Sequence, residues 1–70
     1  MVITLKAARI NAGLTQSEVA KKIGKSVGTV SFYEAGKTIP KWDVLSKMAD
    51  LYGVSIDSLV RPVEVVAKQT

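Results

Sequence analysis

Apolar residues recur at helical spacing along most of this chain and divide it into five predicted helices. Positions three and four residues apart form one buried face in each segment, and glycines or prolines separate the segments. The helices are expected at residues 4–12, 16–23, 27–35, 42–51 and 56–60. This pattern predicts an all-α fold.

The segment at 15–33 has the clearest helix start and stop signals. Thr15 and Glu18 form a Thr-x-x-Glu capping box, which predicts a helix that starts directly after Thr15. Gly24 supplies the left-handed position that ends this helix, and Ser26 can cap the next one. Two short helices joined by a tight turn form a helix-turn-helix, the motif that places its second helix in the major groove of DNA.

Composition narrows the chemistry that this chain can perform. Its 70 residues include no Cys and no His, which excludes disulfides, thiolate metal sites and imidazole bases. We therefore expect no enzymatic activity, no cofactor and no metal. The net charge of +4, from ten Lys and Arg against six Asp and Glu, fits a phosphate-facing surface once it is combined with a helix-turn-helix.

Neither the start of the chain nor its apolar runs have the pattern of a targeting signal. No run approaches the roughly 20 residues that a membrane-spanning helix needs. The first ten residues are too short and too charged to form a signal peptide. We expect a cytoplasmic protein without a membrane partner.

The motifs along the chain resemble those of the Cro/cI family of helix-turn-helix domains, also called the xenobiotic-response-element type. The matching residues are Leu5-Lys6-Ala7-Ala8-Arg9, Gly13-Leu14-Thr15-Gln16, Glu18-Val19-Ala20, Gly24, Ser26, Val30-Ser31, Glu34-Ala35-Gly36-Lys37, Pro40, Leu45, Ala49, Val54-Ser55 and Leu59. The resemblance implies a five-helix lambda-repressor-like DNA-binding domain over residues 3–60, followed by a C-terminal tail at 61–70.

Arg9 falls inside the apolar stripe of the predicted helix at 4–12, where a charged residue is unusual. From composition alone it can be a surface arginine whose aliphatic stem lies along the apolar face. The resemblance implies another role, because family members pair this arginine with a glutamate that here is Glu34. That pairing would be a largely buried, structural ion pair that fixes the angle of the helix at 27–35.

The resemblance makes the helix at 27–35 the recognition helix. Its outward positions, which would contact bases, are Val27, Gly28, Ser31 and Phe32. Such positions usually carry Gln, Asn, Arg or Lys, which read base edges by hydrogen bonds. Here the apolar side chains can contact thymine methyl groups instead, and the serine can bond a phosphate or a base.

Two of these outward positions have an alternative interpretation. Val27 can pack into the core or against a partner protein as well as against DNA, whereas Phe32 is expected to be exposed because Val30 and Tyr33 take the inward face. Gly28 is unfavourable inside a helix. Either a marginal first turn tolerates this glycine, or the missing side chain lets the backbone approach base edges.

Contacts to DNA phosphates are expected from polar and basic residues around the recognition helix. They are Gln16, Lys25, Ser26, Lys37, Thr38 and Lys41. Gln16 is either solvated or reaches a phosphate at the start of its helix, where the dipole favours anions. The loop at 37–41 suits a phosphate clamp through its lysines, its threonine and the free N–H groups of the next helix. The alternative is a solvated basic loop.

Specific binding is expected to need two copies of the chain, because one recognition helix covers only a few base pairs. The expected homodimer contacts are Ile56, Val60 and Val63. The tail around Val63-Glu64-Val65 alternates apolar and polar residues, so it is either a strand that pairs across the dimer or a frayed end.

Together, these expectations predict a sequence-specific regulator of transcription that binds double-stranded DNA. It would repress by occupying a near-palindromic operator as a homodimer, with no small-molecule ligand. An antitoxin or the controller of a restriction system would use the same fold. A protein-interaction module that has lost DNA binding is the alternative from another class, and the apolar outward face of the helix at 27–35 favours it.

Overall fold

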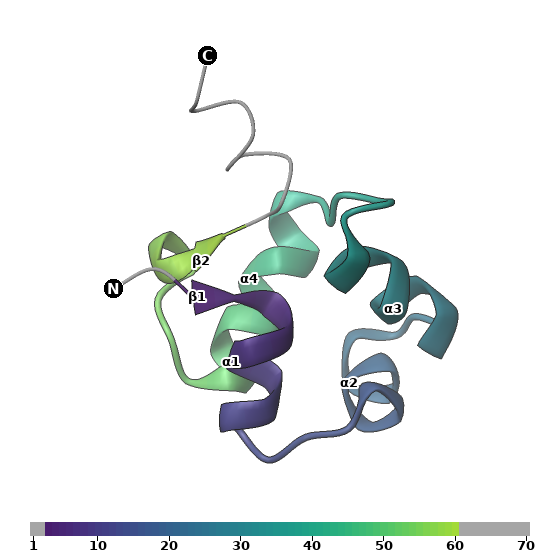
Figure 1. The fold of residues 1–70 in the computed structure, drawn as a ribbon, viewed down its shortest axis with the longest axis horizontal. Helices are drawn as coiled ribbons and strands as arrows, with labels where there is room; N and C mark the ends of the chain where they lie inside the picture. Colours follow the sequence, from purple (N-terminus) through teal and green to yellow (C-terminus); the bar gives the residue numbers. More distant parts are fainter. Residues whose placement is uncertain (1–2, 61–70) are drawn as a thin grey trace.

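Four α-helices pack around one core in the computed structural model, which describes residues 3–60. They are α1 (Leu5–Asn11), α2 (Gln16–Ile23), α3 (Val27–Ala35) and α4 (Trp42–Tyr52). A 3-10 helix, η1 (Ile56–Ser58), and two short strands, β1 (Ile3–Thr4) and β2 (Leu59–Val60), complete the described part. In Figure 1, α2 and α3 pack together on one side of the domain, and the strand pair lies beside α1 on the other.

Local capping explains where α2 and α3 begin and end. The predicted capping box is present: the Glu18 backbone N–H donates to Thr15 Oγ1 at 3.1 Å, and the Thr15 N–H donates to Glu18 Oε1 at 2.8 Å. The second of these bonds lowers the pKa of the Glu18 carboxyl, because it stabilises the charged form. Gly24 ends α2 with φ at 72°, and Ser26 caps α3 by accepting from the Thr29 N–H at 3.1 Å. These boundaries agree with the prediction.

The core takes apolar side chains from all four α-helices and from β2. Its buried members are Leu5, Ala8, Val19, Ala20, Ile23, Val30, Tyr33, Val44, Leu45, Met48, Ala49, Tyr52 and Leu59. Val30 and Tyr33 thus face inward as expected, which turns the opposite side of α3 toward solvent. No helix within residues 3–60 is long and apolar enough to cross a membrane.

The predicted fifth α-helix is wrong. Only Ile56–Ser58 is helical, as a single 3-10 turn, and Leu59 then adopts extended backbone at the start of β2. Ser55 makes no capping bond to the backbone; its hydroxyl lies 2.8 Å from that of Ser58. β2 instead pairs in parallel with β1, with Ile3 opposite Leu59, and this pairing buries the leucine in the core.

The first helix, α1, begins one residue later than predicted. Thr4 is its cap rather than its first residue, because the Thr4 hydroxyl accepts from the Ala7 N–H at 3.1 Å. At the other end of the chain, the alternation at 63–65, which predicts a strand or a frayed end, lies outside the described residues.

Candidate nucleic-acid interface

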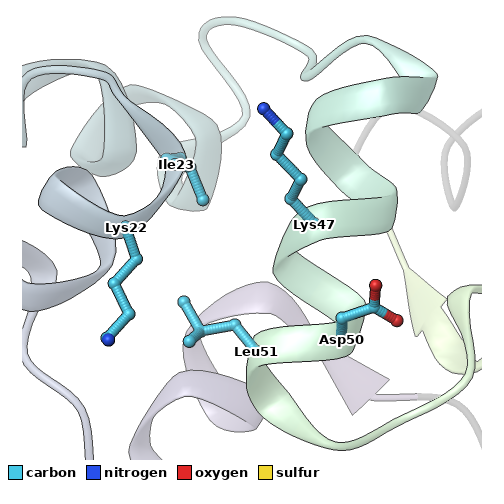
Figure 2. A pocket seen from close by; sticks show the side chains of 5 residues that line it. All are labelled: Lys22, Ile23, Lys47, Asp50 and Leu51. Atoms are coloured by element: carbon cyan, nitrogen blue, oxygen red, sulfur yellow. The ribbon is translucent and has the colours of Figure 1, made fainter.

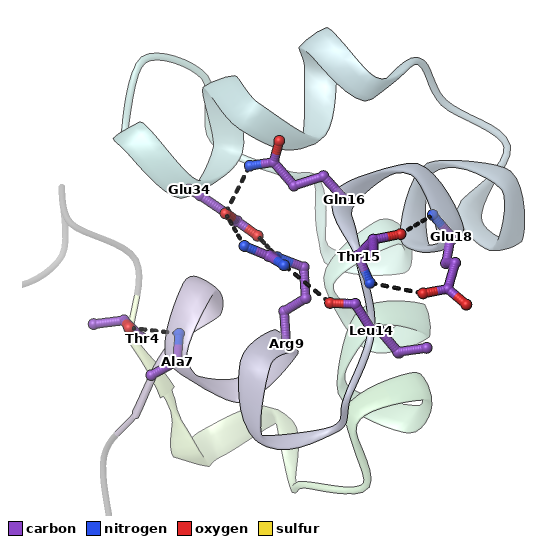
Figure 3. A network of polar contacts seen from close by, with 8 residues as sticks. All are labelled: Thr4, Ala7, Arg9, Leu14, Thr15, Gln16, Glu18 and Glu34. Carbon is purple, nitrogen blue, oxygen red and sulfur yellow. Dashed lines mark hydrogen bonds and ion pairs between the residues drawn. The ribbon is translucent and has the colours of Figure 1, made fainter.

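The Glu34 carboxylate on α3 is the centre of a polar network that reaches two other helices (Figure 3). Arg9 on α1 donates from Nε to Glu34 Oε2 at 2.6 Å and from Nη2 to Oε1 at 3.3 Å. The two side chains are 12% and 4% exposed, respectively. The structure therefore brings Arg9 and Glu34 together as expected, in a bidentate and mostly buried ion pair.

The network also contains a link that the sequence analysis did not assign. Gln16, the first residue of α2, donates from its amide nitrogen to Glu34 Oε1 at 2.9 Å. Arg9 Nη1 donates to the Leu14 carbonyl at 2.9 Å. This bond connects α1 to the loop before α2. One carboxylate thus joins α1, α2 and α3, and it fixes α3 relative to α2. Sequence spacing carries no signal for the Gln16–Glu34 bond, which depends on the angle between the two helices.

Two side chains in this region, Arg9 and Tyr52, have shifted pKa values. The hydrogen bond to Glu34 raises the pKa of the Arg9 guanidinium, so the arginine stays protonated. Tyr52, near the end of α4, is buried, and burial together with the charge of Glu34 raises its pKa to about 12. The ion pair therefore lies near a neutral phenol at any physiological pH.

The outward surface of α3 is exposed and mostly apolar. We call it the α3 outer face, and it consists of Val27, Gly28, Ser31 and Phe32. Val27 is 45% exposed and Phe32 is 49% exposed, so neither belongs to the core. A Cβ atom on Gly28 would meet only Ser26 Oγ, at 3.8 Å. Packing within the chain therefore does not require glycine at this position.

Basic residues lie at both ends of the α3 outer face. Lys25 is exposed before α3, and Lys37 and Lys41 are exposed in the loop at 37–41, together with Thr38. The Lys37 ammonium lies 5.6 Å from the centre of the Phe32 ring, a cation–π contact that sequence spacing did not reveal.

The start of α4 differs from the other helix starts. Among the α-helices of residues 3–60, α4 alone begins without a side-chain cap, because Lys41 at its cap position makes no such bond. The first backbone N–H groups of α4 therefore have no side-chain acceptor. The helix dipole favours an anion at this end of the helix.

The remaining predicted phosphate contacts already have partners within the chain. Gln16 uses one amide N–H on Glu34, which leaves a second N–H on the same nitrogen. The Ser26 hydroxyl caps α3 and also lies 2.9 Å from the Thr29 hydroxyl.

Of the expected dimer contacts, Ile56 is partly buried and packs against the core. Val63 lies outside the described residues.

A shallow cleft of about 350 Å³ lies between α2 and α4 (Figure 2). It is lined by Lys22, Ile23, Lys47, Asp50 and Leu51. This set offers neither a nucleophile paired with a base nor a carboxylate pair. No group of three or more acidic side chains within residues 3–60 is placed to hold a metal ion.

The packed α2–turn–α3 pair, with an exposed face on its second helix, defines a helix-turn-helix protein. Sequence comparison leads to the same class: the profile of the helix-turn-helix family, Cro/C1 type, matches residues 5–59. The chain belongs to this family.

Three curated sequences illustrate its relatives. The chain is 42% identical over 64 residues to the HTH-type transcriptional regulator ImmR of Bacillus subtilis, covering 91% of this chain and 50% of that protein. It is 39% identical over 56 residues to the cryptic phage CTXphi transcriptional repressor RstR of Vibrio cholerae, covering 80% and 50%. It is 33% identical over 54 residues to multiprotein-bridging factor 1c of Arabidopsis thaliana, covering 77% and 36%.

The chain thus spans about half the length of the first two relatives. No solved structure matches it significantly.

Proposed function

We propose that this chain is a sequence-specific regulator of transcription, acting as a repressor, that inserts α3 into the major groove of double-stranded DNA. The observation that carries the proposal is the α3 outer face: it is exposed, it has lysines at both ends, and it belongs to a helix that Glu34 fixes. The similarity to a transcriptional regulator and a phage repressor supports it. Repression would follow from occupation of the promoter.

The proposed phosphate contacts surround the inserted helix. Lys25, Lys37 and Lys41 supply cations, and Thr38 supplies a hydroxyl in the loop that leads to the uncapped start of α4. Gln16 can reach a phosphate with its free amide hydrogen while it stays bonded to Glu34. The Ser26 hydroxyl already accepts from the Thr29 N–H and contacts the Thr29 hydroxyl, so we expect it to contribute least.

Binding to DNA should weaken steeply as salt concentration rises. Each cation that neutralises a phosphate contributes about 0.9 to the slope of log K against log salt. Lys41→Ala should therefore flatten the slope by about one such step, with the preferred DNA sequence unchanged. The affinity can be followed at several salt concentrations through the single tryptophan, Trp42, which is 64% exposed at the start of α4.

Lys6→Ala is the matched control, because Lys6 is exposed on α1 and its removal changes the net charge equally. That variant should keep the parent slope. Lys37→Ala should also flatten the slope, but it removes the contact with Phe32 as well and is the less clean test. A slope near zero in the parent chain would exclude this surface as a DNA site.

Two chains should bind each operator. Selection of bound sequences from random duplex DNA should enrich a near-palindrome whose half-sites lie about 34–36 Å apart, one turn of the duplex. Sedimentation on that duplex should give two chains per DNA. The proposed dimer contacts remain Ile56, Val60 and Val63. A footprint covering one half-site, with a Hill slope of one, would contradict the dimer.

Two other functions are compatible with particular observations. An antitoxin or a restriction-system controller would bind DNA in the same way and differ only in the gene it regulates. A protein-interaction module is favoured by the apolar α3 outer face and by the similarity to a multiprotein-bridging factor. The selection experiment separates that class from DNA binding, because an interaction module would enrich no sequence.

A further inference from the structure

The hydrogen-bonding side chains of α3 other than Ser31 are either bonded within the chain or turned into the core. The Thr29 hydroxyl lies 2.9 Å from Ser26 Oγ, and the Tyr33 side chain is buried. The Glu34 carboxylate accepts from Arg9 and Gln16. α3 contains no lysine, arginine, asparagine or glutamine. Ser31 is therefore the only hydrogen-bonding side chain on the α3 outer face.

Because α3 offers few hydrogen-bonding groups to DNA, it would distinguish one base pair from another mainly through apolar contacts. In the major groove, the apolar feature that differs between base pairs is the methyl group on C5 of thymine, which cytosine lacks. Val27 and Phe32 are both about half exposed and stand on either side of Gly28, whose missing side chain leaves space over the helix backbone.

We propose, building on the DNA-binding function above, that the α3 outer face recognises pyrimidine 5-methyl groups in the major groove. Thymine and 5-methylcytosine carry this group at the same place. The recognition surface should therefore accept 5-methylcytosine where it accepts thymine, and binding should respond to cytosine methylation of the operator. The lysines at both ends of the face favour duplex DNA as the occupant, because their charge complements the phosphates.

Lys37 would help this recognition by positioning the Phe32 ring. Its ammonium lies 5.6 Å from the centre of the Phe32 ring, so it restrains the ring on the side of the loop at 37–41. When that ammonium meets a phosphate, the ring is held against the neighbouring base edge. Lys37 is thus a positioning residue for Phe32 as well as a phosphate contact.

The test uses the operator obtained by selection. Each thymine is replaced in turn by uracil, which removes only the methyl group, and the dissociation constant is measured. Burial of one methyl corresponds to about a fourfold change in affinity, so removing the symmetric pair from both half-sites should weaken binding roughly 15-fold. Replacing a contacted T·A pair by C·G should weaken binding, and methylating that cytosine should recover about fourfold per site.

Two variants locate the effect on the protein. Val27→Ser and Phe32→Ser each replace an exposed apolar side chain, so both should fold. Each should bind thymine and uracil operators with equal affinity at the position that its side chain contacts. Lys6→Ala should keep the full difference. For Lys37→Ala, the uracil effect at the Phe32 position should shrink while the effect at the Val27 position persists.

The measurements distinguish a loss of methyl recognition from a loss of DNA binding. Salt-dependent, sequence-preferring binding that is equal on thymine and uracil operators would overturn methyl recognition and leave the proposed function standing. Equal affinity for cytosine and 5-methylcytosine operators would do the same. If no sequence is enriched and no salt-dependent binding occurs, the proposed function itself is wrong.

Discussion

Replacing Arg9 by Ala is expected to lower the free energy of unfolding by about 3–5 kcal/mol, because it leaves a buried carboxylate without its counter-ion. Glu34 is only 4% exposed and would keep one neutral donor, the Gln16 amide. The Leu14 carbonyl would lose its donor as well. A domain of this length has a total stability of about 4–10 kcal/mol, so much of it would be lost. Urea and thermal unfolding, followed by far-UV circular dichroism, measure the change.

Two companion variants show whether the ion pair is the cause. Lys6→Ala removes a cation from the exposed side of the same helix and should unfold like the parent. The double variant Arg9→Met/Glu34→Leu removes both charges and should be more stable than either single substitution, since no unpaired charge remains. Parent-like unfolding of Arg9→Ala would show that the pair contributes little to the fold.

Replacing Gly28 by Gln is expected to weaken operator binding roughly 5- to 150-fold while the domain stays folded. The long side chain would hold α3 away from the base edges, and the recognition of bases that this prevents is worth about 1–3 kcal/mol. The fold should tolerate the change, because the φ angle of Gly28 is not positive and only Ser26 Oγ lies near the position of its Cβ. Binding to the selected operator and thermal unfolding are measured on the same preparation.

Gly28→Ala and Ala12→Gln are the controls for this experiment. Alanine should raise the free energy of unfolding by about 0.5–1 kcal/mol, the usual gain over glycine inside a helix. Ala12→Gln places the same long side chain at an exposed position after α1 and should leave operator affinity unchanged. If Gly28→Gln binds as tightly as the parent, close approach of the α3 backbone to DNA is excluded.

Features that depend on local chemistry were predictable from the sequence. The bounds of α2 and α3 agree with expectation because the Thr15–Glu18 capping box, Gly24 and Ser26 act within a few residues. The exposure of Phe32 was predictable for a related reason, since Val30 and Tyr33 already fill the inward side of α3. Helical periodicity alone determines that arrangement.

Features that depend on distant parts of the chain were not predictable. The strand pair joins Ile3 to Leu59 through two-residue strands, which are too short to show an alternating pattern. That pairing replaced the expected fifth helix. The Gln16–Glu34 bond and the Lys37–Phe32 contact likewise exist only because of the angle between helices and the path of a loop. The Arg9–Glu34 pair was anticipated through the family resemblance, since residue spacing contains no such information.

The fixing of α3 by Glu34 has a consequence for how such a domain changes its target over evolutionary time. Val30 and Tyr33 hold the helix in place from the side turned away from the α3 outer face, and Glu34 holds it through bonds to Arg9 and Gln16. Substitutions on an exposed face of this kind usually alter stability by no more than about 0.5 kcal/mol. On the proposed function, a lineage could therefore exchange one DNA target for another through a few mutations that leave the fold intact.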